Sequence, residues 1–283
     1  KKVNNQVSIY IPAYNAESTI REVIDSILNQ SYKFDEIIVV NDSSNDKTVE
    51  KIKSFSEIKI INNNTNKGLG FSRNVGIENC KNEIVAGIDA DVVLDKFWLE
   101  TILSYLKKDK IVMCGGNLKE KLTENKFNLW RSIYYKQNWG EQEMLNPPFL
   151  YGCNTIQLKS IWKQIGGYNE ELKTNGEDVE YCNRVRSNQD TNVFYSNKAL
   201  CYHLQNDNMK TLSKRVWRYH SFGYKIKKPT IYRFIKLTIK QIKFFFQRSI
   251  SSLFKLNFYF LYINSFILLD FIKLELKNVL KEK

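Results

Sequence analysis

The sequence has little proline and histidine and no paired cysteines, and each shortage excludes a class of protein. Four prolines and two histidines occur among 283 residues, and the five cysteines include no Cys-x-x-Cys pair. The low proline content, together with 43% hydrophobic residues, argues against a disordered chain. The scattered cysteines argue against a zinc site or a disulfide framework and favour reduced thiols in a cytosolic protein. The opening residues lack the apolar segment of a signal peptide, so none is expected.

Acidic residues are scarce only in the last quarter of the chain. The net charge is +13, and residues 205–283 account for all of it with 17 basic and 4 acidic residues. Residues 1–204 hold 26 residues of each sign. A change of composition of this size predicts a domain boundary near residue 205.

The first third of the chain alternates between short apolar runs and helical patterns. Runs at 7–12, 36–41, 58–63 and 83–88 are rich in β-branched residues and predict strands. Between them, apolar residues spaced three and four apart predict helices, as at 20–28. This alternation is typical of right-handed βαβ units, so we expect an α/β fold with a mostly parallel sheet.

Polar residues follow three of the predicted strands. These segments run from Pro12 to Asn15, from Asn41 to Ser44 and from Asp89 to Asp91. Because the carboxyl ends of parallel strands meet at one edge of a sheet, all three should open onto one crevice. Two carboxylates there could hold a hard divalent cation, which completes its shell with water and phosphate oxygens. Alone, an Asp-x-Asp pair is more often a solvated turn, but its place beside the other strand ends favours the cation.

A second acidic pair stands at the start of a predicted helix in the stretch NGEDVEYCNRV. Glu177 and Asp178 precede apolar residues at 179, 182 and 185. Acidic residues favour helix N-termini through the helix macrodipole. One of the two carboxylates could instead point into the crevice as a general base. The pattern alone supports both interpretations.

The chain resembles the family 2 glycosyltransferases with the GT-A fold in six segments that follow the family's order. These are VSIYIPAYNAESTIREVIDSILNQSY, IIVVNDSSNDKT, NKGLGFSRNVGI, VAGIDADVVL, IGGYNEEL and GEDVEYCNRV. The resemblance implies a Rossmann-like GT-A catalytic domain over residues 1–204. Its 1–115 half would bind the nucleotide sugar and its 116–204 half would carry the acceptor site and catalytic base. Residues 205–283 would form a basic, amphipathic helical extension.

The resemblance also implies roles for residues around the donor. The implied donor-binding residues are Pro12, Tyr14, Asn15, Asp42, Arg73, Asp89 and Ala90. Asp42 would hydrogen-bond the base, and Arg73 would sit beside the base or the phosphate. These two match the usual uracil contacts, so a UDP-sugar is the expected donor, with GDP and dTDP as alternatives.

The same resemblance implies an inverting, metal-dependent transfer. Asp91 and Asp89 would hold Mn²⁺ or Mg²⁺, which stabilises the leaving diphosphate. Asp178, supported by Glu177, would take the proton of the acceptor hydroxyl on the opposite face of an oxocarbenium-like sugar. His203 would be either a further metal ligand or a structural histidine at a strand end.

The expected reaction adds a single hexosyl or N-acetylhexosaminyl group. The chain lacks the Gln-x-x-Arg-Trp motif of the family's processive synthases. The expected acceptor is a lipid-linked or membrane-proximal glycan in cell-surface polysaccharide or glycoconjugate synthesis. The alternatives are transfer to polyprenyl phosphate or to a protein, and a non-catalytic module that binds nucleotide sugars.

The tail combines positive charge with apolar bulk. The basic residues with helical spacing are Arg233, Lys236, Lys240 and Lys243. The apolar run from residue 256 has 14 uncharged residues before Asp270, and a spanning helix needs about 20. We therefore expect residues 225–272 to lie on an anionic membrane, which makes the protein cytoplasmic and peripheral on the inner face of the cell membrane. The alternative is packing of the apolar faces on the catalytic domain; no nucleic-acid partner is expected.

Overall fold

The computed structural model describes residues 6–188, 190–222 and 229–281 and divides the chain into two compact units. The first unit comprises residues 1–121 and 136–204, and the second comprises residues 122–135 and 205–283. The division therefore differs from the one predicted from charge, because residues 122–135 associate with the tail. Of the segment predicted to touch a membrane, residues 225–228 lie outside the described residues.

Four parallel strands form one half of the sheet in the first unit. They are β3 (Ile58–Asn62), β2 (Glu36–Asn41), β1 (Val7–Ala13) and β4 (Ile84–Ile88), in that spatial order. The helices between them are α1 (Ile20–Leu28), α2 (Thr48–Ile52) and α3 (Leu69–Asn79). All four strands pair in parallel register, which confirms the α/β fold predicted from the alternating pattern.

The other half of the sheet is mixed. Beyond β4 follow β8 (Asn154–Leu158), β6 (Ile111–Glu120), β9 (Asn192–His203) and β5 (Val92–Leu94), while β7 (Met144–Leu145) pairs with β9. Pairing is antiparallel between β4 and β8, between β8 and β6 and between β9 and β5, and parallel between β6 and β9. The sheet thus brings β5, which directly follows Asp91, beside the end of β9.

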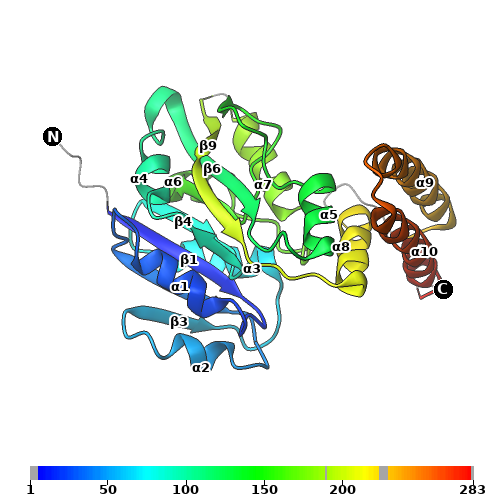
Figure 1. Cartoon of the computed structure of the whole chain (residues 1–283). Coiled ribbons are helices and arrows are strands. Elements are labelled where there is room, and N and C mark those ends of the chain that lie inside the picture. The colour runs from blue at the N-terminus through cyan, green and yellow to red at the C-terminus, as the bar shows by residue number, and fades with distance from the viewer. Residues whose placement is uncertain (1–5, 189, 223–228, 282–283) are drawn as a thin grey trace. The chain divides into compact units, whose positions relative to one another are not determined.

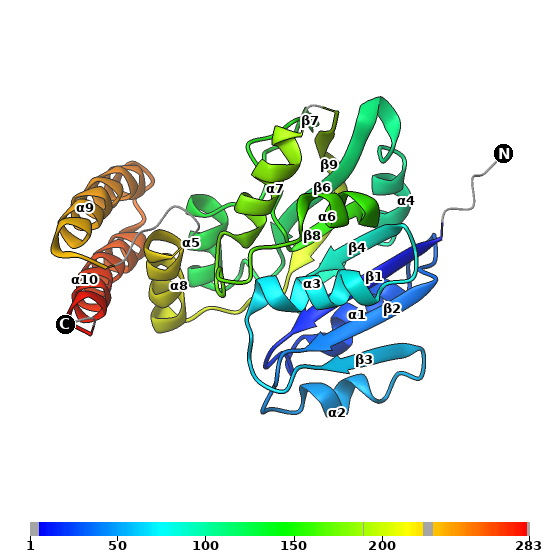
Figure 2. The same ribbon diagram turned by 180° about the vertical axis from the view of Figure 1, so that it is seen from behind.

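Helices cover both faces of this sheet. α1 and α4 (Trp98–Leu103) pack on one face, and α3, α6 (Lys159–Ile165) and α7 (Glu177–Ser187) pack on the other, as Figures 1 and 2 show from opposite sides. A short 3-10 turn spans Lys108–Lys110. Each face of β1 is buried in its own apolar cluster, which is why the strand reads as a continuous apolar run.

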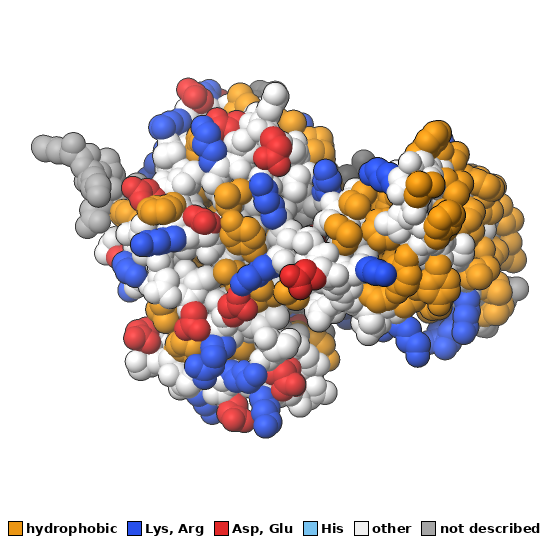
Figure 3. Space-filling model, in the orientation of Figure 1, with side chains coloured by type: hydrophobic (Ala, Val, Ile, Leu, Met, Phe, Trp, Pro, Cys, Tyr) orange, Lys and Arg blue, Asp and Glu red, His pale blue; other side chains and the backbone are white. Residues whose placement is uncertain are grey.

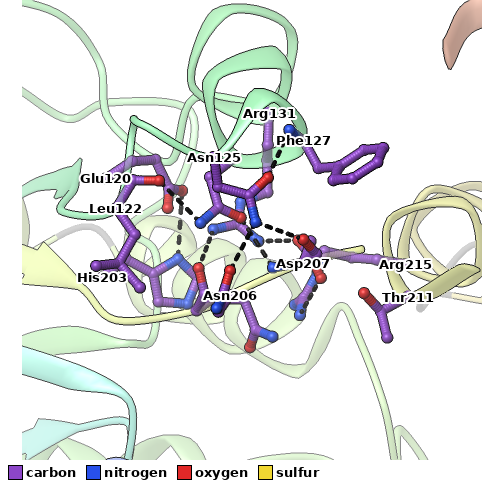
Figure 4. Close-up of polar contacts among 12 residues, drawn as sticks. Glu120, Leu122, Asn125, Phe127, Arg131, His203, Asn206, Asp207, Thr211 and Arg215 are labelled. Atoms are coloured by element: carbon purple, nitrogen blue, oxygen red, sulfur yellow. Dashed lines mark hydrogen bonds and ion pairs between the residues drawn. The ribbon is translucent and has the colours of Figure 1, made fainter. Parts of the chain in front are cut away.

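The second unit consists of helices around a small aromatic core. They are α5 (Lys126–Tyr134), α8 (Met209–Ser221), α9 (Ile231–Phe254) and α10 (Phe258–Leu280). The core residues are Trp130, Leu212, Val216, Phe260, Ile263 and Ile267. Buried ion pairs reinforce it: Arg131 and Arg215 both reach Asp207 (Figure 4), and Arg233 pairs with Glu275 at 2.9 Å. The basic face predicted for 233–243 is therefore wrong at Arg233, which is drawn inward by the buried Glu275.

Helix α9 has an unusual distribution of side chains. Its buried residues are Gln241, Arg248, Ser249 and Ser252. Its exposed apolar residues are Ile231, Tyr232, Ile235, Ile239, Ile242, Phe246, Ile250, Leu253 and Phe254. In Figure 3 apolar side chains gather over α9 and α10. No helix in the described part of the chain has the length and apolar content to span a bilayer.

Two glycines allow α3 and β4 to pack closely against Tyr10 of β1. A Cβ at Gly76 would lie 2.6 Å from the Tyr10 ring, and one at Gly87 would lie 2.4 Å from its hydroxyl. The aromatic ring is fully buried between them. Any side chain at either position would have to displace it.

We expect Gly76→Ala to lower the free energy of unfolding by about 1 to 3 kcal/mol, because the added methyl group overlaps the buried Tyr10 ring. Chemical denaturation measures the change. Glu78→Ala, an exposed position on the same helix, is the control and should change stability little. Equal stability of Gly76→Ala and the wild type would contradict this account of the packing.

Candidate active site

The loops after β1 and β2 are tied together at the edge of the sheet. Pro12 is buried in β1 opposite Val40, and Tyr14 is 51% exposed. The backbone N–H of Asn15 donates to Ser44 Oγ at 3.0 Å, and Asn15 Oδ1 accepts from the N–H of Asn45 at 2.9 Å. Two predicted donor-binding segments therefore meet, as the parallel arrangement of the strands requires.

Asp42, one residue beyond β2, holds the glycine-rich loop that precedes α3. Its carboxylate accepts from the N–H groups of Lys67 at 2.9 Å and Gly68 at 2.8 Å, and from Asn63 Nδ2 at 2.8 Å. The side chain is buried. Asp42 thus orders the loop before α3, and its predicted contact with a nucleotide base stays a prediction.

Arg73 on α3 joins three segments of the site. Its side chain is 1% exposed. Nη2 donates to Asp89 Oδ1 at 2.8 Å, Nη1 donates to the carbonyl oxygen of Gly152 at 2.6 Å, and Nε lies 3.5 Å from Glu177 Oε1. The guanidinium therefore faces protein groups, whereas the sequence predicted a place beside the base or phosphate. Burial makes its contacts with two carboxylates structurally important.

Gly152 connects Arg73 to the predicted base. Its N–H donates to Asp178 Oδ2 at 3.0 Å while its carbonyl accepts from Arg73, and the next carbonyl, of Cys153, accepts from the N–H of Asp89 at 3.1 Å. A Cβ on Gly152 would lie 3.0 Å from Asp178 and 3.1 Å from Arg73. Asp178 and Asp89, which are far apart in sequence, thus hydrogen-bond two adjacent residues, Gly152 and Cys153. The motif search missed Gly152, although it stands in the stretch GCN just before β8.

Glu177 and Asp178 begin α7 but lie in different surroundings. Asp178 is partly exposed and also accepts from the N–H of Val179 at 2.8 Å. Glu177 is buried, and burial and the neighbouring Asp178 raise its pKa to about 8 although Arg73 opposes the rise. Burial and the charges of Asp91 and Asp178 likewise raise the pKa of Asp89, against the effect of Arg73 and His203. The cluster is therefore short of positive charge.

Asp91 and His203 form a pair at the end of the β5–β9 ladder, where Val92 is opposite His203. His203 Nε2 lies 3.2 Å from Asp91 Oδ2, and Nδ1 lies 3.3 Å from Glu120 Oε1. Figure 4 shows His203 beside Glu120, a residue that sequence reasoning missed. Burial lowers the histidine pKa, but Asp91 and Glu120 outweigh it and raise the value to about 9. Both ring nitrogens thus face carboxylates, and the two predicted roles of His203, metal ligand or structural histidine, stay predictions.

The acidic residues at the strand end suit a hard cation in number and kind. The side chains of Asp89 and Asp91 are 28% and 30% exposed, and the main chain between them is held where Thr19 Oγ1 donates to the carbonyl of Ala90 at 2.7 Å. Across the described ranges, no group of three or more His, Cys, Asp or Glu side chains is arranged to hold a metal. Two carboxylates are nevertheless what Mg²⁺ or Mn²⁺ takes when water and phosphate oxygens complete its shell.

Comparison with known proteins agrees with this geometry. The family model described as Glycosyl transferase family 2 matches residues 8–166. An uncharacterized glycosyltransferase of Haemophilus influenzae is 38% identical over 132 residues, which is 45% of this chain and 41% of that protein. The chain spans 41%, 54% and 32% of the lengths of three curated relatives that it matches.

Two solved structures show the same fold. The mannosyltransferase PcManGT from Pyrobaculum calidifontis, in complex with GDP-Man and Mn²⁺, has a TM-score of 0.65 at 15% identity and covers 98% of this chain and 88% of that one. The TarS 1-349 structure from S. aureus, in complex with UDP, has a TM-score of 0.59 at 18% identity and covers 95% and 90%. Together with the family match, these confirm the GT-A fold expected from the sequence motifs.

We expect the wild type to lose stability relative to Glu177→Gln as the pH rises from about 5 to about 9. The folded protein binds a proton at Glu177 with a pKa of about 8 against an ordinary 4.5. Between these values the folded state holds more protons than the unfolded state, so rising pH favours unfolding. Denaturation curves at several pH values measure the difference, and exposed Glu171→Gln is the control. A difference between Glu177→Gln and the wild type that does not change with pH would refute the raised pKa.

Proposed function

The chain belongs to glycosyl transferase family 2, and on that premise we propose that it is an inverting enzyme that transfers one sugar from a nucleoside diphosphate to an acceptor hydroxyl. The observation that carries the proposal is the convergence on Gly152 and Cys153. The carboxylate of Asp178 and the backbone N–H of Asp89 each hydrogen-bond this dipeptide, which supports a single site for the proposed base and the proposed diphosphate side. An inverting transfer requires such a pair of acidic groups on either side of the sugar.

Asp178 is the proposed base. Its two oxygens are oriented by the N–H groups of Gly152 and Val179, and the side chain is partly exposed to receive an acceptor. It would take the proton of the attacking hydroxyl, while the sugar leaves the diphosphate on the opposite face. Glu177 supports the base indirectly, since it contacts the Arg73 that also binds Gly152.

Asp91, with Asp89, would hold Mn²⁺ or Mg²⁺. The bound cation would supply charge neutralisation to the leaving diphosphate. His203 would act as a positioning residue: Glu120 contacts its Nδ1, and its Nε2 would keep Asp91 oriented. Tyr14 and Asn15, at the exposed end of β1, and Asp42, at the end of β2, would bind the nucleotide, for which we propose UDP.

We also propose that the acceptor is lipid-linked and that α9 lies on the anionic inner face of the cell membrane. The apolar stripe of Ile235, Ile239, Ile242, Phe246 and Ile250 is exposed. The exposed lysines 236, 240 and 243 follow it by one residue, about 100° further round the helix. A basic stripe beside an apolar one suits insertion at the level of acidic headgroups. The opposite face of α9, which carries its buried polar residues, packs within the second unit and could reach a membrane only if the core of that unit were exposed.

We expect Asp178→Asn to lower kcat by about 10²- to 10⁴-fold while leaving the affinity for the donor unchanged, because it removes only proton transfer. A panel of UDP-, GDP- and dTDP-sugars, with Mn²⁺ or Mg²⁺ and then with chelator, measures donor hydrolysis or transfer, and calorimetry measures binding. Asp190→Asn, at an exposed position, is the matched control. Asp91→Ala should abolish the divalent-dependent turnover of the donor, because it removes a proposed ligand of the cation.

Unchanged turnover in Asp178→Asn would remove the base assignment. Donor binding by the wild type without transfer or hydrolysis, with every sugar and cation, would instead identify a non-catalytic binding module.

We expect Ile239→Glu combined with Phe246→Glu to weaken binding to phosphatidylcholine–phosphatidylglycerol vesicles by about tenfold or more, since each large apolar side chain contributes roughly 1.5 to 3 kcal/mol when buried. Vesicle sedimentation at low and high salt measures it. Leu145→Glu, an exposed leucine of β7, is the control. Equal vesicle binding by the double variant and the control would exclude this surface.

A further inference from the structure

Arg248 on α9 differs from the other buried arginines of the chain. Arg73, Arg131 and Arg233 each pair with an aspartate or glutamate. Arg248 is 9% exposed, and within the described residues no carboxylate forms an ion pair with it. A buried cation without a counter-ion is unfavourable unless other groups replace its hydration.

Aromatic rings supply part of that replacement. The Arg248 guanidinium carbon lies 5.2 Å from the centroid of Trp130, 5.0 Å from Tyr135 and 5.3 Å from Phe244. Nη2 donates to Tyr135 Oη at 2.6 Å. Ring faces attract a cation but leave its other N–H groups without acceptors. The guanidinium therefore keeps donors for a further partner.

A cavity that opens to solvent adjoins this guanidinium in the second unit. Its volume is about 280 Å³, and its lining residues are Tyr134, Tyr135, His220, Phe244, Gln247 and Arg248. Tyr135 Oη lies 2.9 Å from His220 Nε2, so hydroxyl, imidazole and guanidinium form one connected polar wall. The cavity can hold several water molecules or a small polar group.

The charged side chains that the described residues place at this cavity are positive. Lys240 Nζ and the Arg248 guanidinium lie 5.6 Å and 5.3 Å from the centroid of the same ring, that of Phe244. Burial, Lys240 and Arg248 together lower the pKa of His220 to about 3, and no carboxylate contributes. The imidazole is therefore neutral at physiological pH, and the cavity favours an anion.

We propose that this cavity binds a phosphate group, with Arg248 as its main ligand. A guanidinium presents parallel N–H donors that match two phosphate oxygens, and Gln247 adds an amide donor. The group could belong to a lipid headgroup or to a free phosphate ion. A lipid source is compatible with the exposed apolar residues Phe246 and Ile250, which adjoin Gln247 and Arg248 along α9. This site is separate in the sequence from the proposed catalytic residues and does not depend on their roles.

The first experiment uses inorganic phosphate on the full chain, titrated against sodium chloride at equal ionic strength. A ligand that binds only the folded state raises the melting temperature with concentration. We expect phosphate to raise it for the wild type and for Lys236→Gln, which removes one exposed charge from the same helix. Arg248→Met should lose the effect, with an apparent Kd at least tenfold weaker, and Arg248→Lys should keep part of it because charge remains without the paired donors.

The second experiment identifies the source of the phosphate. Phosphatidylcholine vesicles with and without phosphatidic acid are sedimented with each variant. A larger loss of binding to phosphatidic acid in Arg248→Met than in Lys236→Gln supports the cavity with a lipid headgroup as its ligand. Equal losses of vesicle binding in the two variants, together with a phosphate-induced rise in melting temperature that requires Arg248, support the cavity with the free phosphate ion as its ligand. Circular dichroism checks that Arg248→Met is folded, and Arg248→Lys carries the comparison if it is not.

Two results together overturn the proposal. Phosphate would raise the melting temperature of Arg248→Met as much as that of the wild type, or would raise neither. Arg248→Met and Lys236→Gln would also bind phosphatidic acid vesicles equally. In that case Arg248 is held by aromatic contacts alone.

Discussion

The candidate active site depends on one buried cation. Arg73 contacts Asp89, Glu177 and the carbonyl of Gly152, which lie just after β4, at the start of α7 and in the segment before β8. Without it, the partly buried Asp89 would lose its ion-pair partner, and breaking a buried ion pair costs about 3 to 5 kcal/mol. The main contribution of Arg73 is therefore to stability, because its positive charge allows acidic residues to lie close together in the folded protein.

The same requirement organises the second unit. Asp207 is shared by Arg131 and Arg215, and Glu275 accepts hydrogen bonds from Trp217 and Ser221 and forms an ion pair with Arg233, so both carboxylates have a positive partner. On α9, the pair with Glu275 draws Arg233 inward, while the large apolar residues of this helix stay exposed. Arg248 is the buried cation that this pairing does not satisfy, and the exposed apolar face is the part of α9 that the core does not use. Arg248 and the exposed apolar residues both belong to α9, and for this reason we propose a phosphate group and a membrane surface as partners of this helix.

The sequence predicted what depends on local pattern and topology. Apolar runs located β1 to β4, and parallel pairing placed Asp42, Asp89 and the segment around Asn15 at one edge of the sheet. It did not predict Glu120 and Gly152, because their importance arises from contacts with residues more than twenty positions away. It could not predict the protein contacts of Arg73 and Arg233 for a related reason, since burial beside a carboxylate decides where an arginine points. The charge pattern likewise could not assign residues 122–135, whose place in the second unit rests on the packing of Trp130.

The adjacent carboxylates of α7 show how one helix start can serve two purposes. Consecutive helical residues point about 100° apart, so Glu177 and Asp178 cannot face the same surroundings. Glu177 turns into the protein toward Arg73, where burial favours its protonated form, and Asp178 turns toward Gly152 at the rim of the crevice. A protonated Glu177 adds no negative charge beside Asp178 and Asp89. The order of the two residues, and not acidity alone, therefore decides which carboxylate is buried and which is partly exposed as the proposed base.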